Sequence, residues 1–515
     1  MKNQSVSIAT PSFVSGDVET EPGQASTREY GSRRRPWSKV LGFSTLLSGV
    51  LATFVYLLAG HTIADPDIWW HLRNAEHLIG AGEMVRHDFY SFTAAGAGWI
   101  NHEWLGELPF YFAWRWLGFR GLYLVVLLLA EAIILGVFYL SRSVSGNVKA
   151  TFLATWIAAW LATVSLAPRP LLFGWLFLAI ELAVLTKFSA GIDRTWLLPP
   201  LFLIWANTHG SWLIGMVLLL TFFICGLVHG NWGRIETQLW TRRERLKLGW
   251  VCALSMAALF VNPWGHRLVL YPFNLAFRQT ANIAHISEWQ SLDFHSVRGK
   301  FVFVVLAATI VLALVRRTRW KLWEALFVLV SFYGAMTYSR FTFLAAIVIT
   351  PFLARASNFL APYRAEVDRP ILNGLLLLGM AIIPFATFPT QWQLEQGTRN
   401  SYPANALLYL EHFRPEGRVL NDYLWGGYLI WNVRQIPVFV DSRVDIFEYA
   451  GVFQDYVTAK SGVGSLDVLD KYKIRYVLHS KQGEPLAYLL MHNPGWKVDY
   501  EDDVTVLLER INPVP

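Results

Sequence analysis

The sequence predicts an α-helical polytopic membrane protein with a small α/β soluble domain at its carboxyl end. Of the 515 residues, 54% are hydrophobic and only 16% are charged, and the mean hydropathy is +0.35. Soluble domains are less apolar, and a single apolar core does not extend over this length. Apolar segments recur up to about residue 388, after which the composition becomes that of a soluble domain.

Charge and cysteine content argue against two other classes of protein. The net charge is +7 and the pI is near 9.2, but the basic residues are scattered in short runs between apolar segments. Proteins that bind nucleic acid gather such residues on one face, so we expect no nucleic-acid partner. Both cysteines lie inside apolar runs, which leaves neither a disulfide framework nor a thiolate metal site.

The amino-terminal arm, residues 1–36, is polar and ends in Arg33, Arg34 and Arg35. It contains neither the apolar core nor the cleavage site of a signal peptide. We therefore expect a disordered cytoplasmic arm.

Eleven apolar segments of the sequence are candidate transmembrane helices, because a bilayer core of about 30 Å needs roughly 20 apolar residues. The fifth is short, and Pro199 and Pro200 favour a broken helix there. The predicted spans cover residues 38–60, 119–140, 149–166, 170–187, 195–208, 211–230, 246–262, 299–315, 320–338, 341–355 and 371–388.

Alternate connections between the predicted spans are short and basic. If the amino-terminal arm is cytoplasmic, these connections share its side, as the positive-inside rule requires. They include residues 142–149, 187–194, 242–247, 316–321 and 355–369. We expect a multi-pass protein of a bacterial plasma membrane, whose remaining loops and carboxyl-terminal domain are extracytoplasmic.

The first outer loop, residues 61–118, belongs to a predicted transmembrane domain over residues 37–388. Apolar residues have helical spacing within residues 69–79, and aromatic residues recur every few positions over residues 103–116. These patterns predict two amphipathic helices at the membrane interface.

Residues 389–515 are predicted to form the extracytoplasmic α/β domain. Short apolar runs predict strands at residues 418–420, 438–440 and 476–479 and a hairpin over residues 498–508. Helical patterns over residues 403–413, 448–460 and 465–472 alternate with them. This alternation is typical of small α/β domains.

Asp65, Pro66 and Asp67 place two carboxylates just after the first apolar segment. The proline keeps the pair out of a helix, so the carboxylates can share Mg²⁺ or Mn²⁺, or one can take a proton from an acceptor hydroxyl. Alternatively, Asp67 caps the helix that begins at Trp69. Because capping leaves Asp65 unexplained, we favour catalysis by the pair, with a divalent cation left open.

Other polar residues of the predicted outer segments are candidates for binding substrate. Imidazoles and carboxylates can orient a catalytic base or a substrate. The structural alternatives are that these side chains cap helices, hydrogen-bond to backbone groups at a helix break, or lie on the solvated surface. The candidates are His71, Asp88, His102, Glu103, Asn207 and His209.

Arg169 and Arg340 lie in predicted short outer connections, where the positive-inside rule depletes arginine. Ionisable residues at membrane level are functional candidates, and the guanidinium fork suits phosphate. Snorkelling to lipid headgroups is the alternative. We favour a phosphate partner, with Arg340 slightly ahead of Arg169.

The second long outer loop and the carboxyl-terminal domain supply further candidate contacts to an acceptor. A glycine pair flanked by aromatics lets backbone approach a ligand closely, and polar groups after a buried strand lie where open α/β sheets bind ligands. A structural turn is equally compatible with these two stretches. The candidates are Glu288, Tyr423, Trp425, Tyr428, Asp441 and Arg443.

From residue 38 onward the chain resembles the GT-C class of integral-membrane glycosyltransferases. The resemblance rests on the acidic motif early in the first outer loop, the amphipathic helices of that loop, the many spans and the outer soluble domain. It implies a polyprenyl-phosphate or polyprenyl-diphosphate sugar donor and inversion at the anomeric centre. It also implies a catalytic carboxylate at Asp65 or Asp67.

The stretch from Tyr423 to Tyr428 is similar to the tryptophan-tryptophan-aspartate-tyrosine-glycine region of oligosaccharyltransferase catalytic subunits, but it lacks the aspartate before the final tyrosine-glycine. Glu288 is similarly placed to their outer-loop glutamate. Arg169, between Pro168 and Pro170, stands where those enzymes carry a second acidic motif. This departure favours a simpler glycosyltransferase, such as those that transfer mannose or arabinose to lipid or protein.

The sequence hypothesis is therefore an inverting glycosyltransferase of the cell envelope. Its donor would be a polyprenyl-linked sugar and its acceptor a lipid, a glycan or a protein. A transporter of lipid-linked sugars without chemistry is the rival, although transporters favour internal repeats and polar groups at the bilayer midplane. A catalytically inactive GT-C scaffold is the other alternative.

Overall fold

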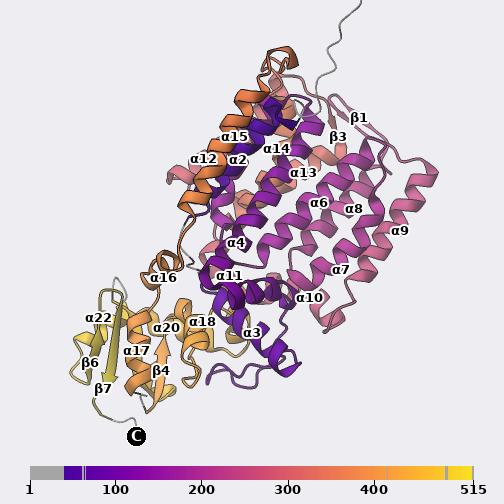
Figure 1. The fold of residues 1–515 in the computed structure, drawn as a ribbon. Coiled ribbons are helices and arrows are strands. Elements are labelled where there is room, and N and C mark those ends of the chain that lie inside the picture. Colours follow the sequence, from indigo (N-terminus) through magenta and orange to yellow (C-terminus); the bar gives the residue numbers. More distant parts are fainter. Residues whose placement is uncertain (1–39, 61–62, 64, 414–415, 482–484, 513–515) are drawn as a thin grey trace, which may run out of the picture.

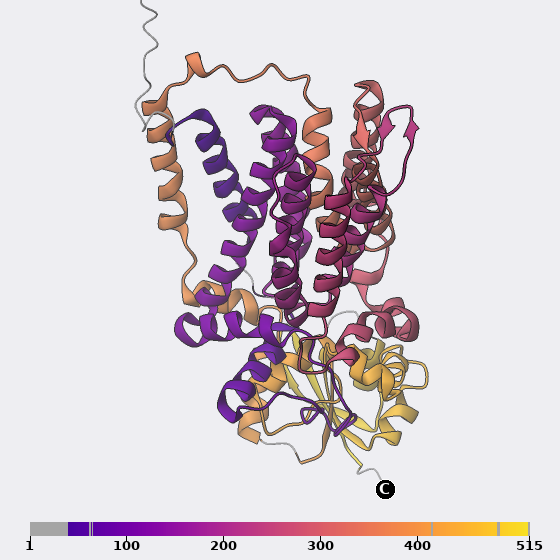
Figure 2. The same cartoon turned by 90° about the vertical axis from the view of Figure 1, so that its right-hand side faces the viewer.

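The computed structural model describes residues 40–60, 63, 65–413, 416–481 and 485–512, so the predicted arm over residues 1–36 lies outside the described residues. Long helices pack side by side into a bundle (Figure 1). The carboxyl-terminal region lies against one end of this bundle, next to the first outer loop (Figure 2). The protein is an integral, multi-pass membrane protein.

Every predicted span is helical over most of its length. Within the described residues, six helical segments are long and apolar enough to cross a membrane, and three apolar helices are shorter. A count of eleven crossings therefore stays a prediction. The helices of the bundle are α2 (Phe43–Leu58), α4 (Trp104–Ser145), α5 (Val148–Ala162), α6 (Leu171–Ser189), α7 (Leu198–Thr208), α8 (Trp212–Cys225), α9 (Arg242–Ala258), α12 (Val297–Val315), α13 (Leu322–Thr337), α14 (Thr342–Ala356) and α15 (Pro370–Thr387).

The predicted cytoplasmic connections meet at one end of the bundle. There β1 (Asn231–Trp232) pairs with β2 (Ile235–Glu236), and β2 pairs in parallel with β3 (Trp320–Lys321) from a distant connection. Lys247, from the same connection as β1 and β2, forms an ion pair with Asp193 of another connection. The predicted outer loops lie at the opposite end, against the carboxyl-terminal region (Figure 2).

The first outer loop contributes α3 (Ile68–Ala81) and the first part of α4. Within α4, Gly118 has a non-helical backbone that separates the predicted helix over residues 103–116 from the span that follows. Gly118 has φ 58° and ψ −137°, a conformation that side chains disfavour. Helix α3 buries one face, with Trp69 and Leu72 at most 1% exposed, whereas Ile79 is 44% exposed. Its place at the membrane interface stays a prediction.

The second long outer loop contains α10 (His266–Arg278), α11 (Thr280–His285) and the short 3₁₀ turn Ser287–Trp289. Glu448 accepts hydrogen bonds from the backbone N–H groups of Ala281 and Asn282, at 2.9 and 2.8 Å. The carboxyl-terminal region thereby holds the amino end of α11, a few residues before Glu288.

The carboxyl-terminal region contains a four-stranded sheet of order β4-β5-β7-β6. Strand β4 runs parallel to β5, and the β5–β7 and β7–β6 pairs are antiparallel. The strands are β4 (Arg418–Asn421), β5 (Ile474–Ser480), β6 (Trp496–Glu501) and β7 (Thr505–Arg510), and the helices from α16 onward are α16 (Gln391–Arg399), α17 (Ala404–Phe413), α18 (Tyr423–Asn432), α19 (Val444–Tyr449), α20 (Val452–Lys460), α21 (Ser465–Lys471) and α22 (Pro485–Met491).

Residues 438–440 do not form a strand of this sheet, so that prediction was wrong. Val438 instead pairs with the first outer loop, donating to Tyr90 O at 3.0 Å and accepting from Phe92 N at 3.1 Å. The backbone of this buried apolar run therefore makes its hydrogen bonds to a loop more than 300 positions away in sequence. Local pattern cannot distinguish this pairing from a sheet ladder.

Gly426 and Gly427 have a packing role within α18 rather than an open approach to a ligand. A Cβ on Gly426 would lie 2.3 Å from Val440 O, and one on Gly427 would lie 2.5 Å from Pro66 O. Both glycines are buried. Gly427 lets α18 approach the backbone at Pro66, and Gly426 lets it approach the backbone at Val440 and Asp441.

We expect Gly427→Ala to lower the melting temperature of the purified protein, because its methyl group has no room beside Pro66. Overpacking of this kind costs about 1–3 kcal/mol. Gly80→Ala is the matched control, since a Cβ there meets nothing within 4 Å and alanine favours a helix by about 0.5–1 kcal/mol. Thermal unfolding in detergent measures both variants, and a wild-type melting temperature for Gly427→Ala would contradict this packing.

Candidate active site

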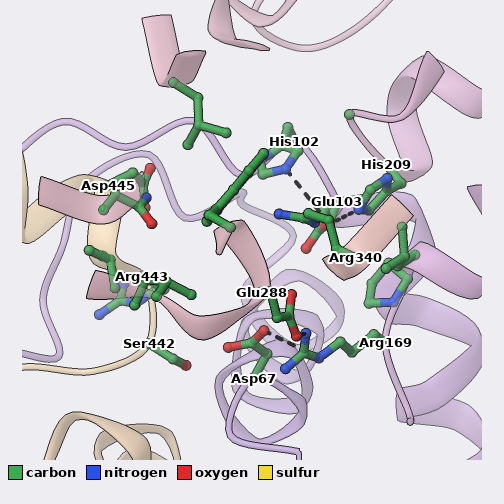
Figure 3. Close-up of a pocket in the computed structure, with 18 of the residues that line it drawn as sticks. Asp67, His102, Glu103, Arg169, His209, Glu288, Arg340, Ser442, Arg443 and Asp445 are labelled. Carbon is green, nitrogen blue, oxygen red and sulfur yellow. Dashed lines mark hydrogen bonds and ion pairs between the residues drawn. The ribbon is translucent and has the colours of Figure 1, made fainter. Parts of the chain in front are cut away.

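A cavity of about 540 Å³ lies where the predicted outer ends of the helices meet the carboxyl-terminal region. Figure 3 shows its charged side chains pointing inward from both outer loops, from the ends of α6 and α14 and from the segment before α19. The predicted site residues that line it are Asp67, His71, His102, Glu103, Arg169, His209, Glu288, Arg340, Tyr423 and Arg443. Those that do not are Asp65, Asp88, Asn207, Trp425, Tyr428 and Asp441.

Arg169 joins three carboxylates on one wall of the cavity. Its Nε forms an ion pair with Asp65 Oδ2 and lies 3.7 Å from Asp67 Oδ2, and its Nη1 pairs with Glu288. The Asp65 side chain is 2% exposed, whereas that of Asp67 is 24% exposed. Of the two aspartates, therefore, Asp67 is the one that a substrate in the cavity can reach.

The two aspartates also differ in their hydrogen bonds. Asp65 Oδ1 accepts from the Asp67 N–H at 2.9 Å. Burial raises the pKa of Asp65 to about 6, and the nearby Arg169 guanidinium opposes this shift. The Asp67 carboxylate makes no capping bond to α3, so the capping alternative was wrong. Its Oδ1 is 3.4 Å from Trp70 Nε1, which also donates to Ser442 Oγ at 3.0 Å.

The side chains of Asp65 and Asp67 do not fit a metal site. The Arg169 guanidinium bonds Asp65 and approaches Asp67, which places it where a shared cation would bind. Within the described part of the chain, no group of three or more His, Cys, Asp or Glu side chains could hold a metal ion.

Arg340 is held differently from Arg169. The turn Ser339–Phe341 packs on the turn Ser287–Trp289, with Ser339 N donating to Gln290 O at 2.9 Å and Ser339 Oγ donating to Glu288 O at 3.2 Å. This packing sets the Arg340 guanidinium over the Trp289 ring, 4.3 Å from its centroid. Among the described residues, Arg340 has no hydrogen bond and no ion pair, so its donors are free for a ligand.

A second polar cluster surrounds Glu103. His209 Nε2 and His71 Nε2 lie 3.2 and 3.4 Å from its two oxygens, and His102 Nε2 lies 3.7 Å away. Ser211 N–H donates to His209 Nδ1 at 2.9 Å. Neutral His209 therefore carries its hydrogen on Nε2 and donates it towards Glu103.

Burial governs the titration of this cluster. It raises the pKa of Glu103 to about 7, against the opposing effect of His71, and lowers the pKa of His102 to about 4. Burial disfavours the charged form of His71 as well, but its hydrogen bond to Glu107 and the nearby Glu103 raise its pKa overall. The cluster thus holds exchangeable protons near neutral pH.

Glu107 was not predicted from the sequence, although its carboxylate contacts His71, which also contacts Glu103. Its Oε1 lies 3.0 Å from His71 Nδ1, and Asn101 Nδ2 donates to both of its oxygens, at 3.0 and 2.9 Å. Asn74 donates to it at 3.1 Å. Only the i, i+4 spacing from Glu103 could have indicated that Glu107 faces the same way.

Arg443 lies between Asp88 and Asp441, and all three side chains are fully buried. Its Nη2 is 2.7 Å from Asp88 Oδ1 and 2.6 Å from Asp441 Oδ2. The guanidinium also lies over the rings of Tyr90 and Trp99. The two aspartates, predicted to contact an acceptor, instead bind Arg443 and join the first outer loop to the carboxyl-terminal region.

The remaining predicted residues away from the cavity have structural partners. Asn207, in the last turn of α7, accepts from Trp104 Nε1 and donates to the backbone oxygens Leu203 O and Val261 O. Its side chain therefore has hydrogen-bond partners within the protein. Trp425 donates to Ser401 O. Tyr428 stacks on Tyr402 and meets the edge of Trp69.

Several lining residues were missed by the sequence reasoning. Asp445 accepts from Tyr271 OH at 3.0 Å, and burial raises the pKa of Asp445 to about 6. Its position two residues after Arg443 in a polar run was an available signal. Ser442 lies beside Trp70, but nothing in the sequence marks Tyr271 as a partner of Asp445.

Comparisons with known proteins identify the fold. The apo crystal structure of an Archaeoglobus fulgidus oligosaccharyltransferase matches with a TM-score of 0.50 and 11% identity over 87% of this chain and 70% of that chain. Archaeoglobus fulgidus AglB in complex with an inhibitory peptide and a dolichol-phosphate matches with a TM-score of 0.51 and 11% identity, over 86% and 69% of the two chains.

A third structure, ArnT from Cupriavidus metallidurans bound to undecaprenyl phosphate, aligns at 15% identity over 89% of this chain and 96% of that chain, with a TM-score of 0.48. No protein-family model and no curated protein sequence matches the chain. The chain has the fold of the GT-C class of integral-membrane glycosyltransferases, which confirms the resemblance expected from the sequence.

Arg443→Met should strongly destabilise the protein, because it leaves Asp88 and Asp441 buried without their counterion. Breaking a buried ion pair in this way costs about 3–5 kcal/mol. Arg434→Met is the control, since Arg434 pairs with Glu76 at the surface and such pairs contribute about 0–1 kcal/mol. Urea unfolding should separate the two variants, and equal effects would refute the structural role of Arg443.

Glu103→Gln should make the stability of the protein less dependent on pH. Because the pKa of Glu103 is raised from 4.5 to about 7, the folded protein binds its proton more tightly than the unfolded chain. Its stabilisation is complete below pH 4.5 and is lost as pH rises through about 7, by roughly 3 kcal/mol. Melting temperatures at pH 5 and pH 8 should therefore differ less in Glu103→Gln than in the wild type.

Glu83→Gln provides the control for this pH measurement, because Glu83 is exposed in the same loop. It should keep the wild-type difference between the two melting temperatures. A Glu103→Gln variant with an unchanged difference would show that Glu103 titrates normally.

Proposed function

We propose that the protein is an inverting glycosyltransferase acting at the extracytoplasmic face of a bacterial plasma membrane. It moves a sugar from a polyprenyl-linked phosphate or diphosphate donor to a lipid, glycan or protein acceptor. The observation that carries the proposal is a partly exposed carboxylate, Asp67, which shares one cavity with an uncommitted guanidinium, Arg340. The GT-C fold supports it, as does the dolichol-phosphate in the AglB complex.

Asp67 is the proposed general base. In a single displacement, the acceptor oxygen forms a bond to the anomeric carbon while the bond from that carbon to the phosphate oxygen breaks. The acceptor proton passes to Asp67, and the electron pair of the broken bond stays with the departing polyprenyl phosphate. Asp67 reaches the cavity, whereas Asp65 is buried, so we assign Asp65 a positioning role through Arg169.

Arg340 is the proposed partner of the donor phosphate. Its guanidinium can donate a fork of hydrogen bonds to phosphate oxygens, and a preorganised cation stabilises charge that develops in the transition state. Arg169 was also predicted to bind phosphate, but its contacts with Asp65, Asp67 and Glu288 support a role in holding those carboxylates.

The acceptor subsite is proposed to lie between Glu288, Tyr423 and Arg443, which line the cavity. Tyr423 and Arg443 come from the carboxyl-terminal region, and Glu288 comes from the second long outer loop. An aromatic ring beside carboxylates suits the apolar face and hydroxyl groups of a sugar. The acceptor would therefore enter between the two regions.

Asp67→Asn should lower kcat by about 10²–10⁴-fold, the usual contribution of a general base, and should leave KM nearly unchanged. The assay uses the purified protein in lipid, a polyprenyl-phosphate sugar and a lipid acceptor, with the product detected by mass spectrometry. The control Glu83→Gln should retain full turnover. Full turnover by Asp67→Asn would remove Asp67 from the mechanism, and a product that retains the donor's anomeric configuration would contradict the single displacement.

A further inference from the structure

Three arginines line the cavity, and two of them are already balanced by carboxylates. Arg443 is fully buried between Asp88 and Asp441. This guanidinium has two negative partners within 2.7 Å, so it contributes no net positive charge towards a ligand.

Arg169 is balanced more fully still. It contacts Asp65, Asp67 and Glu288, which come from two different outer loops. Figure 3 shows Arg169 beside Asp67 and Glu288. The charge at this wall is negative overall whenever two of these carboxylates are ionised. The Arg169 pKa is raised because these carboxylates favour its charged form.

Arg340 is the cation that remains for an anionic ligand. Among the described residues it makes no ion pair, and its guanidinium rests on the Trp289 ring at 4.3 Å. Stacking leaves the edge of the guanidinium, where the N–H donors lie, available for oxygen acceptors. Figure 3 places Arg340 between Glu103 and Glu288, so it faces the interior of the cavity.

We infer that the donor carries a single phosphate, whose one phosphodiester charge pairs with Arg340, rather than a diphosphate. The inference rests on the proposed function and narrows its donor class. A charge that enters a partly dehydrated site needs a counterion, because burial of an unpaired ion is costly. Arg340 supplies one counterion, and a phosphodiester brings one charge.

A diphosphate would bring a second negative charge close to Asp67 and Glu288. Proteins commonly balance substrate diphosphates with Mg²⁺ held by carboxylates. Here the Arg169 guanidinium lies against the carboxylates that would hold such an ion. The second charge would therefore face carboxylates without a cation of its own.

Departure of the sugar increases the charge that Arg340 must stabilise. When the bond from the anomeric carbon to oxygen breaks, its electron pair moves onto the phosphate of the leaving polyprenyl phosphate. The phosphate then carries a second negative charge beside Arg340. An interaction that strengthens as this charge develops lowers the barrier rather than only tightening binding.

The experiment compares undecaprenyl phosphate with undecaprenyl diphosphate on the full-length protein in detergent. Native mass spectrometry measures binding of each lipid in Mg²⁺ and in EDTA. We expect the monophosphate to bind about tenfold more tightly or better, with no dependence on Mg²⁺. Equal or tighter binding of the diphosphate, binding of the monophosphate only with Mg²⁺, or binding of neither lipid would overturn the inference.

Variants at Arg340 test whether this residue is the source of the preference. Arg340→Gln should lose about tenfold or more in monophosphate affinity, and Arg340→Lys should recover part of it because it restores the charge without the fork. Arg267→Gln is the matched control, since Arg267 is exposed on α10 in the second long outer loop. Unchanged monophosphate binding in Arg340→Gln would overturn the assignment.

Transfer assays separate this inference from the proposed function. Glycosylated product from a diphosphate donor, but not from the monophosphate donor with the same sugar, would uphold the transferase and overturn the inference. Preferential binding of undecaprenyl phosphate through Arg340, without product from any donor tested, would uphold the monophosphate site and contradict the transferase.

Discussion

The outer end of this protein depends on one guanidinium. Arg169 contacts Asp65 and Asp67 from the first outer loop and Glu288 from the second. Three carboxylates this close would repel one another in a partly buried site without a cation between them. Arg169 supplies that cation from the amino end of α6, so the two loops and the bundle are held in one arrangement. Asp67, Arg169 and Glu288 form one wall of the cavity.

The same physical constraint recurs at each buried charge around the cavity. Arg443 has Asp88 and Asp441 as counterions and thereby ties the first outer loop to the carboxyl-terminal region. Glu103 has three imidazoles within 3.7 Å and a pKa raised to about 7. Arg340 departs from this pattern, because its guanidinium stacks on the Trp289 ring and forms no ion pair among the described residues. That difference supports our proposal that Arg340 binds the donor phosphate.

Much of the architecture was predictable because hydrophobic length and periodicity are local properties. Each predicted span is helical, and the strands at 418–420 and 476–479 and the hairpin at 498–508 lie in the sheet. The failures have non-local causes. Residues 438–440 form a buried apolar run whose backbone partner, the first outer loop, is remote in sequence. The pattern around Gly426 and Gly427 predicts a ligand approach or a turn, whereas both glycines lie inside α18 and pack against Val440 and Pro66.

The sequence by itself determined the membrane-protein class, the GT-C resemblance and the chemical types present near the outer face. It could not decide which groups meet, because ion pairs such as Arg169 with Asp65 and Arg443 with Asp88 join residues 104 and 355 positions apart. Only the tertiary structure placed Asp67 in the cavity, buried Asp65 and, among the described residues, left Arg340 without an ion pair. The reason is that a charge's role depends on its solvent exposure and its partners, which are properties of the folded chain and not of the residue type.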